Sequence, residues 1–211
     1  MILGIDAAST DLSLAVARAD GTVLAEEAWT SDRRQSAELL PHLLALLAAH
    51  GLALQDVAGI GVGTGPGSFT GLRVAMALGK GLAVALARPI VGVPSLAAWL
   101  EADPDAEAAI ARAGAREAFV LGRGSPEPLV AGGDEVTRRF AAAQVVAPAE
   151  LATAWGLTAA TRPQGARTVA ATAARRLAAD PHGDPVATLD PVYLRPPRGI
   201  AVDPREAVPW R

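Results

Sequence analysis

The sequence predicts an α/β fold in which mixed sheets are flanked by helices. In the first hundred residues, short apolar runs alternate with longer segments of helical periodicity. Residues 59–75 pass from five glycine or apolar residues through a glycine-rich turn into helical spacing, which is typical of a strand, a glycine loop and a helix. A further apolar run at 90–93 completes a strand, helix and strand unit, whose two strands should be parallel.

Three strands are expected at the start of the chain, over residues 2–6, 12–19 and 23–29. Asp20-Gly21 separates the last two and is a hairpin signal. The first run is short and apolar, as a buried central strand would be.

A helix is expected over residues 36–50, capped by Ser36 and closed by Gly51, with a kink or a late start at Pro41. Its six leucines cover an arc of about 160°, wider than the stripe of about 100° that one supporting surface needs. Such a helix lies deep in the protein or has two partners, its own sheet and another subunit. The leucines assigned to a partner surface are Leu39, Leu40, Leu43, Leu44 and Leu47.

The helix expected over residues 70–87 carries small residues at intervals of four. They let a second helix approach closely, or they permit close packing on the chain's own sheet. The first interpretation is favoured because the leucine-rich helix is adjacent. The proposed contact residues, which we call the small-residue file, are Gly71, Ala75, Gly79 and Ala83.

The segment 101–107, with Pro104 and two aspartates, predicts a boundary between an N-terminal domain over 1–102 and a smaller, divergent domain over 103–211. The expected elements around this boundary are a helix capped by Ser95 and reaching about Ala102, strands over 118–121 and 129–131, helices over 147–155 and 166–179, and an extended tail from Pro196 onward.

Composition excludes several classes of function. The 211 residues contain no cysteine, which excludes disulfides and thiolate chemistry, and Lys80 is the only lysine. The net charge of −3 and the absence of a basic run argue against direct binding of nucleic acid. His42 and His50 are spaced too far apart for a metal pair, so no metal site is expected. No signal peptide or membrane span is recognised, and the expected location is the cytoplasm.

The glycine loop does not match the known phosphate-binding signatures. Gly67 is followed by Ser68 and Phe69 instead of the Lys and Ser or Thr of a P-loop, and the third glycine of the dinucleotide fingerprint is replaced by Ser68. The plain interpretation is a tight turn whose glycines permit positive φ, with Ser68 or Thr70 capping the helix.

The amino-acid sequence of the loop, Gly65 to Arg73, resembles the signature of the TsaB (YeaZ-like) family. These are bacterial proteins needed to make threonylcarbamoyladenosine in transfer RNA. Segments 5–8, 92–96 and 190–195 agree in order and spacing, whereas the resemblance is faint between about 104 and 190. The motif residues in the loop are Gly65, Pro66, Gly67, Ser68, Phe69, Thr70 and Arg73.

The resemblance implies the actin-like and sugar-kinase-like ATPase superfold (RNase H-like), with two lobes of which the second is trimmed. In that superfold an Asp at the end of a strand serves the metal and phosphates of ATP. Asp6, with Ser9 and Thr10 beyond it, is therefore a candidate vestigial phosphate loop. The alternative is that Asp6 only accepts hydrogen bonds from the turn.

The resemblance also implies a non-catalytic subunit that dimerises with TsaD and activates it for transfer of the threonylcarbamoyl group to adenosine in tRNA. ATP and metal are then expected on TsaD, and ATP on a further partner, TsaE, with no catalytic residue or cofactor on this chain. Self-association through the same helices is a further expectation. The alternative is an independent ATP-dependent small-molecule kinase or ATPase, which needs a second phosphate loop; Gly132-Gly133-Asp134 is the one candidate turn for it.

The chain departs from the family pattern at two places. The family's His before the first helix is Gln35, and its acid at the start of the second domain is missing around Arg112. Tyr193 and Leu194 are expected to pack the tail back onto the body.

Overall fold

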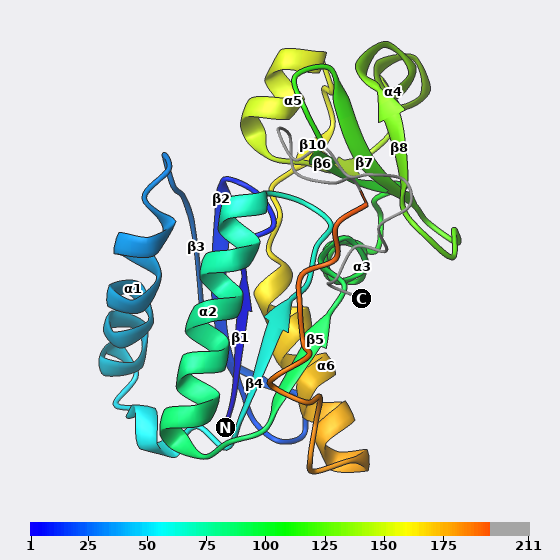
Figure 1. Cartoon of the computed structure of the whole chain (residues 1–211). Coiled ribbons are helices and arrows are strands. Elements are labelled where there is room, and N and C mark those ends of the chain that lie inside the picture. Colours follow the sequence, from blue (N-terminus) through cyan, green and yellow to red (C-terminus); the bar gives the residue numbers. More distant parts are fainter. Residues whose placement is uncertain (195–211) are drawn as a thin grey trace, which may run out of the picture.

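The computed structural model describes residues 1–194 and consists of two lobes, each built on a five-stranded sheet (Figure 1). The tail predicted to be extended from Pro196 lies outside the described residues. An α/β fold with two mixed sheets flanked by helices is therefore confirmed.

The first sheet has the order β3-β2-β1-β4-β5. Its central strand, β1, is antiparallel to β2 and parallel to β4, and every β1 side chain is buried, because the strand has a neighbour on each edge and helices on each face. The strands are β1 (Ile2–Asp6), β2 (Asp11–Ala17), β3 (Val23–Thr30), β4 (Gly59–Gly63) and β5 (Ile90–Val93).

Helices α1 (Gln35–Ala49) and α2 (Phe69–Leu86) cover one face of this sheet, and α6 (Gly165–Ala179) covers the other (Figure 1). The alternation of side chains along the strands decides what each face presents. Leu3 and Ile60 belong to the cluster that includes leucines of α1. Gly4 and Gly61 face α6, where an added Cβ would crowd Ala170 or Val169. Glycine on this face lets α6 lie close to the sheet.

The second sheet has the order β10-β9-β6-β7-β8, and it repeats the pairing of the first. Its central strand β6 is antiparallel to β7 and parallel to β9, as β1 is to β2 and β4. Its elements are β6 (Ala108–Arg112), β7 (Glu117–Gly122), β8 (Leu129–Gly132), α4 (Gly133–Phe140), β9 (Val145–Val146), α5 (Ala149–Trp155) and β10 (Ala160–Thr161). The two halves thus share one topology, although no repeat is visible in the sequence.

The division along the chain near residue 103 does not coincide with the division in space. Helix α6 belongs to the second half of the sequence but packs on β1 and β4 of the first sheet. Helix α3 (Ser95–Ala102) ends the first half, yet Leu96 and Trp99 pack with Phe119 of the second sheet. These two helices join the lobes.

By length and composition alone, α2 is long and apolar enough to cross a membrane, contrary to the expectation from sequence. Its inner side chains, among them Leu72 and Ala75, are buried in the hydrophobic core, as in the core helix of a globular lobe.

Candidate functional site

The leucines of α1 divide between two faces. Leu39, Leu43 and Leu47 are buried in the core of the first lobe. Leu40 and Leu44 point outward and are 41% and 45% exposed. Only the second pair can meet another molecule in the folded protein. The N-terminal cap expected at Ser36 is also absent: the N-cap residue is Arg34, which makes no side-chain cap. Gly51 has φ of 65° directly after the C-cap, as predicted.

The small-residue file of α2 faces the chain's own sheet. The prediction from the sequence that these residues contact another subunit is therefore wrong. Gly71, Ala75, Gly79 and Ala83 are all buried. A Cβ on Gly79 would lie 3.6 Å from Cβ of Val62 in β4, and one on Gly71 would overlap the Ala7 carbonyl after β1. The small side chains let α2 sit close to β1 and β4.

A second file of small residues lies on the opposite, exposed side of α2. Ala77, Gly81 and Ala85 are exposed, and Val84 is 72% exposed. Among the residues that the structure describes, nothing lies within 4 Å of a Cβ added at Gly81, so their packing gives no reason for glycine there. Glycine in an exposed helix interior costs about 1 kcal/mol relative to alanine.

The exposed side chains of both helices lie on the same side of the first lobe, because α1 and α2 are neighbours on one face of the sheet (Figure 1). We call this surface the α1–α2 outer face and define it by Leu40, Leu44, Ala77, Gly81 and Val84. Exposed apolar surface of this kind marks interaction sites in soluble proteins.

The motif loop holds α2 against the turn that follows β1. Ser68 caps α2, since its Oγ accepts a hydrogen bond from the Gly71 amide at 3.2 Å. The Ser68 amide donates to the Ala8 carbonyl at 2.6 Å. Gly67 does not have positive φ; glycine is needed there because a Cβ would overlap the Ala8 carbonyl. Positive φ occurs at Gly65 (95°) instead.

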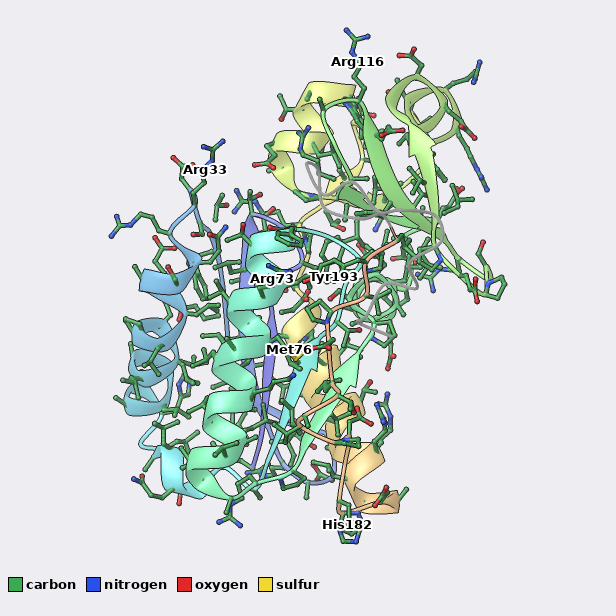
Figure 2. The ribbon with its side chains drawn as sticks, in the orientation of Figure 1. Arg33, Arg73, Met76, Arg116, His182 and Tyr193 are labelled. Atoms are coloured by element: carbon green, nitrogen blue, oxygen red, sulfur yellow. The ribbon has the colours of Figure 1, made fainter. Side chains whose placement is uncertain are left out.

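Arg73 joins the loop to the end of the described chain. Its guanidinium lies 3.9 Å from the centroid of the Phe69 ring, and its Nε donates to the Tyr193 hydroxyl at 3.0 Å. Figure 2 shows Arg73 and Tyr193 side by side between the lobes. The backbone amide of Val192 also donates to the Thr64 carbonyl at 2.8 Å. The prediction that Tyr193 and Leu194 pack the tail onto the body is confirmed for Tyr193, whereas Leu194 is 39% exposed.

Asp6, the candidate phosphate ligand, is buried and has partners inside the protein. Ser95 Oγ donates to one carboxylate oxygen at 2.7 Å, and Trp99 Nε1 donates to the other at 2.5 Å. The amides of Ala8 and Ala7 also hydrogen-bond to it. Burial raises the pKa of Asp6 above its usual value, although these donors oppose the shift.

Ser9 and Thr10, the other two residues of the candidate phosphate loop, are not among the hydrogen-bond partners described for Asp6. Ser9 Oγ donates to the Asp11 carbonyl at 2.9 Å and accepts from the Asp11 amide at 3.0 Å, which closes the turn into β2. Thr10 lines a cavity between the lobes. The arrangement favours the structural interpretation of Asp6, because the donors of α3 occupy the positions that a metal or phosphate-bound water would need.

The cavity between the lobes has a volume of about 600 Å³. Its walls come from the β1–β2 turn, the motif loop, the β6–β7 hairpin, the start of α5 and the last described residues. The residues that line it include Ser9, Thr10, Phe69, Arg112, Phe119 and Glu150. Within residues 1–194, no group of three or more His, Cys, Asp or Glu could hold a metal ion.

A family model described as TsaD, tRNA N6-adenosine threonylcarbamoyltransferase, matches residues 22–178, which is more than half of the chain. An uncharacterised protein of Mycobacterium tuberculosis is 41% identical over 96 residues, covering 45% of this chain and 46% of that protein. The tRNA threonylcarbamoyladenosine biosynthesis protein TsaB of Escherichia coli is 37% identical over 95 residues, covering 45% and 40%. The matched stretch thus spans less than half the length of these curated relatives.

The whole fold is similar to a solved structure, YeaZ from Pseudomonas aeruginosa. That structure is 26% identical with a TM-score of 0.66, and the match covers 92% of this chain and 99% of that one.

Proposed function

Because the chain belongs to the TsaD family of tRNA N6-adenosine threonylcarbamoyltransferases, and is a TsaB/YeaZ-like member of it, we propose that it serves threonylcarbamoyladenosine biosynthesis as an accessory subunit. Its partner in this proposal is TsaD, which it activates for transfer of the threonylcarbamoyl group to adenosine in tRNA. TsaE completes the system.

The α1–α2 outer face is the observation that carries the proposal. Its five residues are uncharged, and Leu40, Leu44 and Val84 are exposed although their side chains are apolar. Burying such side chains at an interface removes apolar area from water, which contributes roughly 25 cal/mol per Å². Gly81 permits close approach of a partner helix at the centre of this surface. We therefore propose that TsaD docks here, and that self-association uses the same face.

In this proposal the chain has no cofactor and no turnover of its own, and ATP and metal are bound by the partners. The state of Asp6 supports this part, since its carboxylate is already satisfied by Ser95 and Trp99. The alternative, an independent kinase or ATPase, would require Asp6 to release these donors before it could serve a metal.

Docking can be tested by placing a charged side chain on the outer face. Leu44→Asp and Val84→Asp should abolish co-elution with the cognate TsaD in gel filtration, because a charge buried without a partner costs several kcal/mol. Leu129→Asp is the matched control, since Leu129 is 48% exposed and lies in the second lobe. Circular dichroism monitors folding. If both outer-face variants fold and still bind TsaD as Leu129→Asp does, the docking surface is elsewhere.

Leu43 and Ala75, which the sequence assigned to the partner surface, are unsuitable positions for this test. Both are fully buried in the core of the first lobe. A charge there would unfold the lobe and would give no information on docking.

A further inference from the structure

The interlobe cavity presents one cationic and one anionic side chain on the same wall. Arg112 ends β6, and Glu150 lies in the first turn of α5. Arg112 Nε and Glu150 Oε1 are 3.9 Å apart, farther than the roughly 2.7–3.2 Å of a hydrogen bond. The side chains are 39% and 43% exposed. Among the described residues that line the cavity, these are the two with charge.

The sign of the two charges restricts the class of ligand. A phosphate or other pure anion near the pair is attracted by Arg112 and repelled by Glu150, and at similar distances the two Coulomb energies largely cancel. A pure cation meets the same cancellation with the signs reversed. A ligand that carries a carboxylate and an ammonium group close together gains from both side chains.

The rest of the wall fits a small organic zwitterion. Phe69 and Phe119 supply apolar surface, and Thr10 brings a polar group from the first lobe. The volume of about 600 Å³ lies in the range of roughly 300–1,000 Å³ found for small-molecule sites. We propose that the interlobe cavity binds a free α-amino acid, with its carboxylate on Arg112, its ammonium on Glu150 and its side chain toward the phenylalanines.

The test uses the full chain and the twenty L-amino acids, each added singly in calorimetry up to about 10 mM, which suits a millimolar Kd. At least one amino acid should bind saturably with one site per chain and should raise the melting temperature. The N-acetyl and methyl-ester forms of that amino acid should bind at least about tenfold more weakly, because each lacks one of the two charges.

Two variants and a matched control connect binding to the charge pair. Arg112→Ala and Glu150→Ala should each weaken binding at least about tenfold, and Arg112→Lys, which keeps the charge, should weaken it less. Arg116→Ala should bind as the original protein does, because Arg116 lies in the same hairpin and points away from the cavity (Figure 2). Docking of TsaD through the outer face does not depend on this site.

Three results would overturn the proposal. The first is that none of the twenty amino acids gives saturable binding at about 10 mM. The second is that the acetylated and esterified forms bind as well as the free amino acid. The third is that Arg112→Ala and Arg116→Ala weaken binding equally while both variants remain folded.

Discussion

Asp6 illustrates how one buried carboxylate organises the first lobe. Moving an ionised carboxylate out of water is costly unless hydrogen bonds compensate. Here Ser95 and Trp99, both in α3, donate to the two oxygens. The carboxylate also excludes any side chain at Gly63 of β4 and at Gly165, where α6 begins. Asp6 therefore fixes the positions of β4, α3 and α6 around the end of β1.

Trp99→Phe should test this role, since it removes one of the hydrogen-bond donors to the buried carboxylate. We expect the free energy of unfolding to fall by about 1–3 kcal/mol and the pKa of Asp6 to rise further, measured by denaturant unfolding and by carbon NMR of the carboxyl group. Trp155→Phe in α5 is the control for loss of an indole. An unchanged pKa of Asp6 would contradict the assignment.

The sign of the pH dependence follows from the raised pKa of Asp6. Between its unfolded and folded pKa values, the native state binds more protons than the unfolded chain, so stability falls as pH rises through this window. In Trp99→Phe the window should extend to higher pH. Asp20 and Glu38 act in the opposite direction: hydrogen bonds to Thr22 and to Ser31 lower the pKa values of their carboxyl groups, so their contributions are lost as pH falls.

Gly67→Val should destabilise the motif loop and abolish support of TsaD-dependent threonylcarbamoyl transfer. The reason is steric, because the new Cβ overlaps the Ala8 carbonyl that accepts the Ser68 amide. The measurement combines thermal unfolding with a reconstituted assay containing TsaD, TsaE, tRNA and threonylcarbamoyl-adenylate. Gly132→Ala is the control, since a Cβ there meets nothing within 4 Å. Equal activity of the two variants would count against the structural importance of the loop.

At the scale of elements, α2 has small residues on two faces, one that packs on the sheet and one that is exposed. The inner file lets the helix lie on β1 and β4. Within residues 1–194 the outer face has no such neighbour, and nothing lies within 4 Å of a Cβ added at Gly81. In the proposed complex, close approach of a partner helix would explain why this position is glycine, although glycine costs helix stability.

Gly81→Ala separates these two effects. In the isolated protein it should raise the free energy of unfolding by about 1 kcal/mol, because alanine is the better helix former and has room. Gly81→Leu should remain folded but lose affinity for TsaD, as measured by gel filtration and calorimetry. A leucine variant with full affinity would show that no helix approaches at this position.

Sequence periodicity predicted the helices and strands with strong patterns and missed several others. The strand at 90–93 was predicted with its observed bounds. The next helix was predicted with its observed end at Ala102, but Ser95, expected as its cap, is its first residue and the N-cap is Pro94. Strand β6 was missed because its alanines lack the β-branched and aromatic residues that indicate strands. Strand β9 has two residues, too few for any period to be visible.

The two rows of small residues in α2 show a second limit of prediction from sequence. Both consist of small residues four apart, so composition cannot tell which one faces the sheet. The partners of Asp6 were also hidden, because Trp99 lies far along the chain. Its helix begins directly after β5 and returns it to the end of β1.

At the scale of the whole molecule, the two lobes are unequal copies of one topology joined by α3 and α6. In the second lobe β9 and β10 have two residues each. The cavity between the lobes opens beside the end of β1. The residues after α6 return along β5 toward the cavity (Figure 1). In this segment Asp184 accepts hydrogen bonds from the Gly92 amide of β5 at 2.8 Å and from Arg176 at 2.6 Å.

This arrangement predicts that MgATP leaves the melting temperature of the isolated protein unchanged. A ligand at 100 times its Kd stabilises a protein by about 2.7 kcal/mol, and each kcal/mol shifts the melting temperature of a chain of this size by roughly 2–4 °C. Real binding would therefore be visible as a shift of several degrees. We expect none with millimolar MgATP, since Ser95 and Trp99 occupy both oxygens of Asp6. A shift of several degrees that disappears in Asp6→Asn would instead favour the kinase or ATPase alternative.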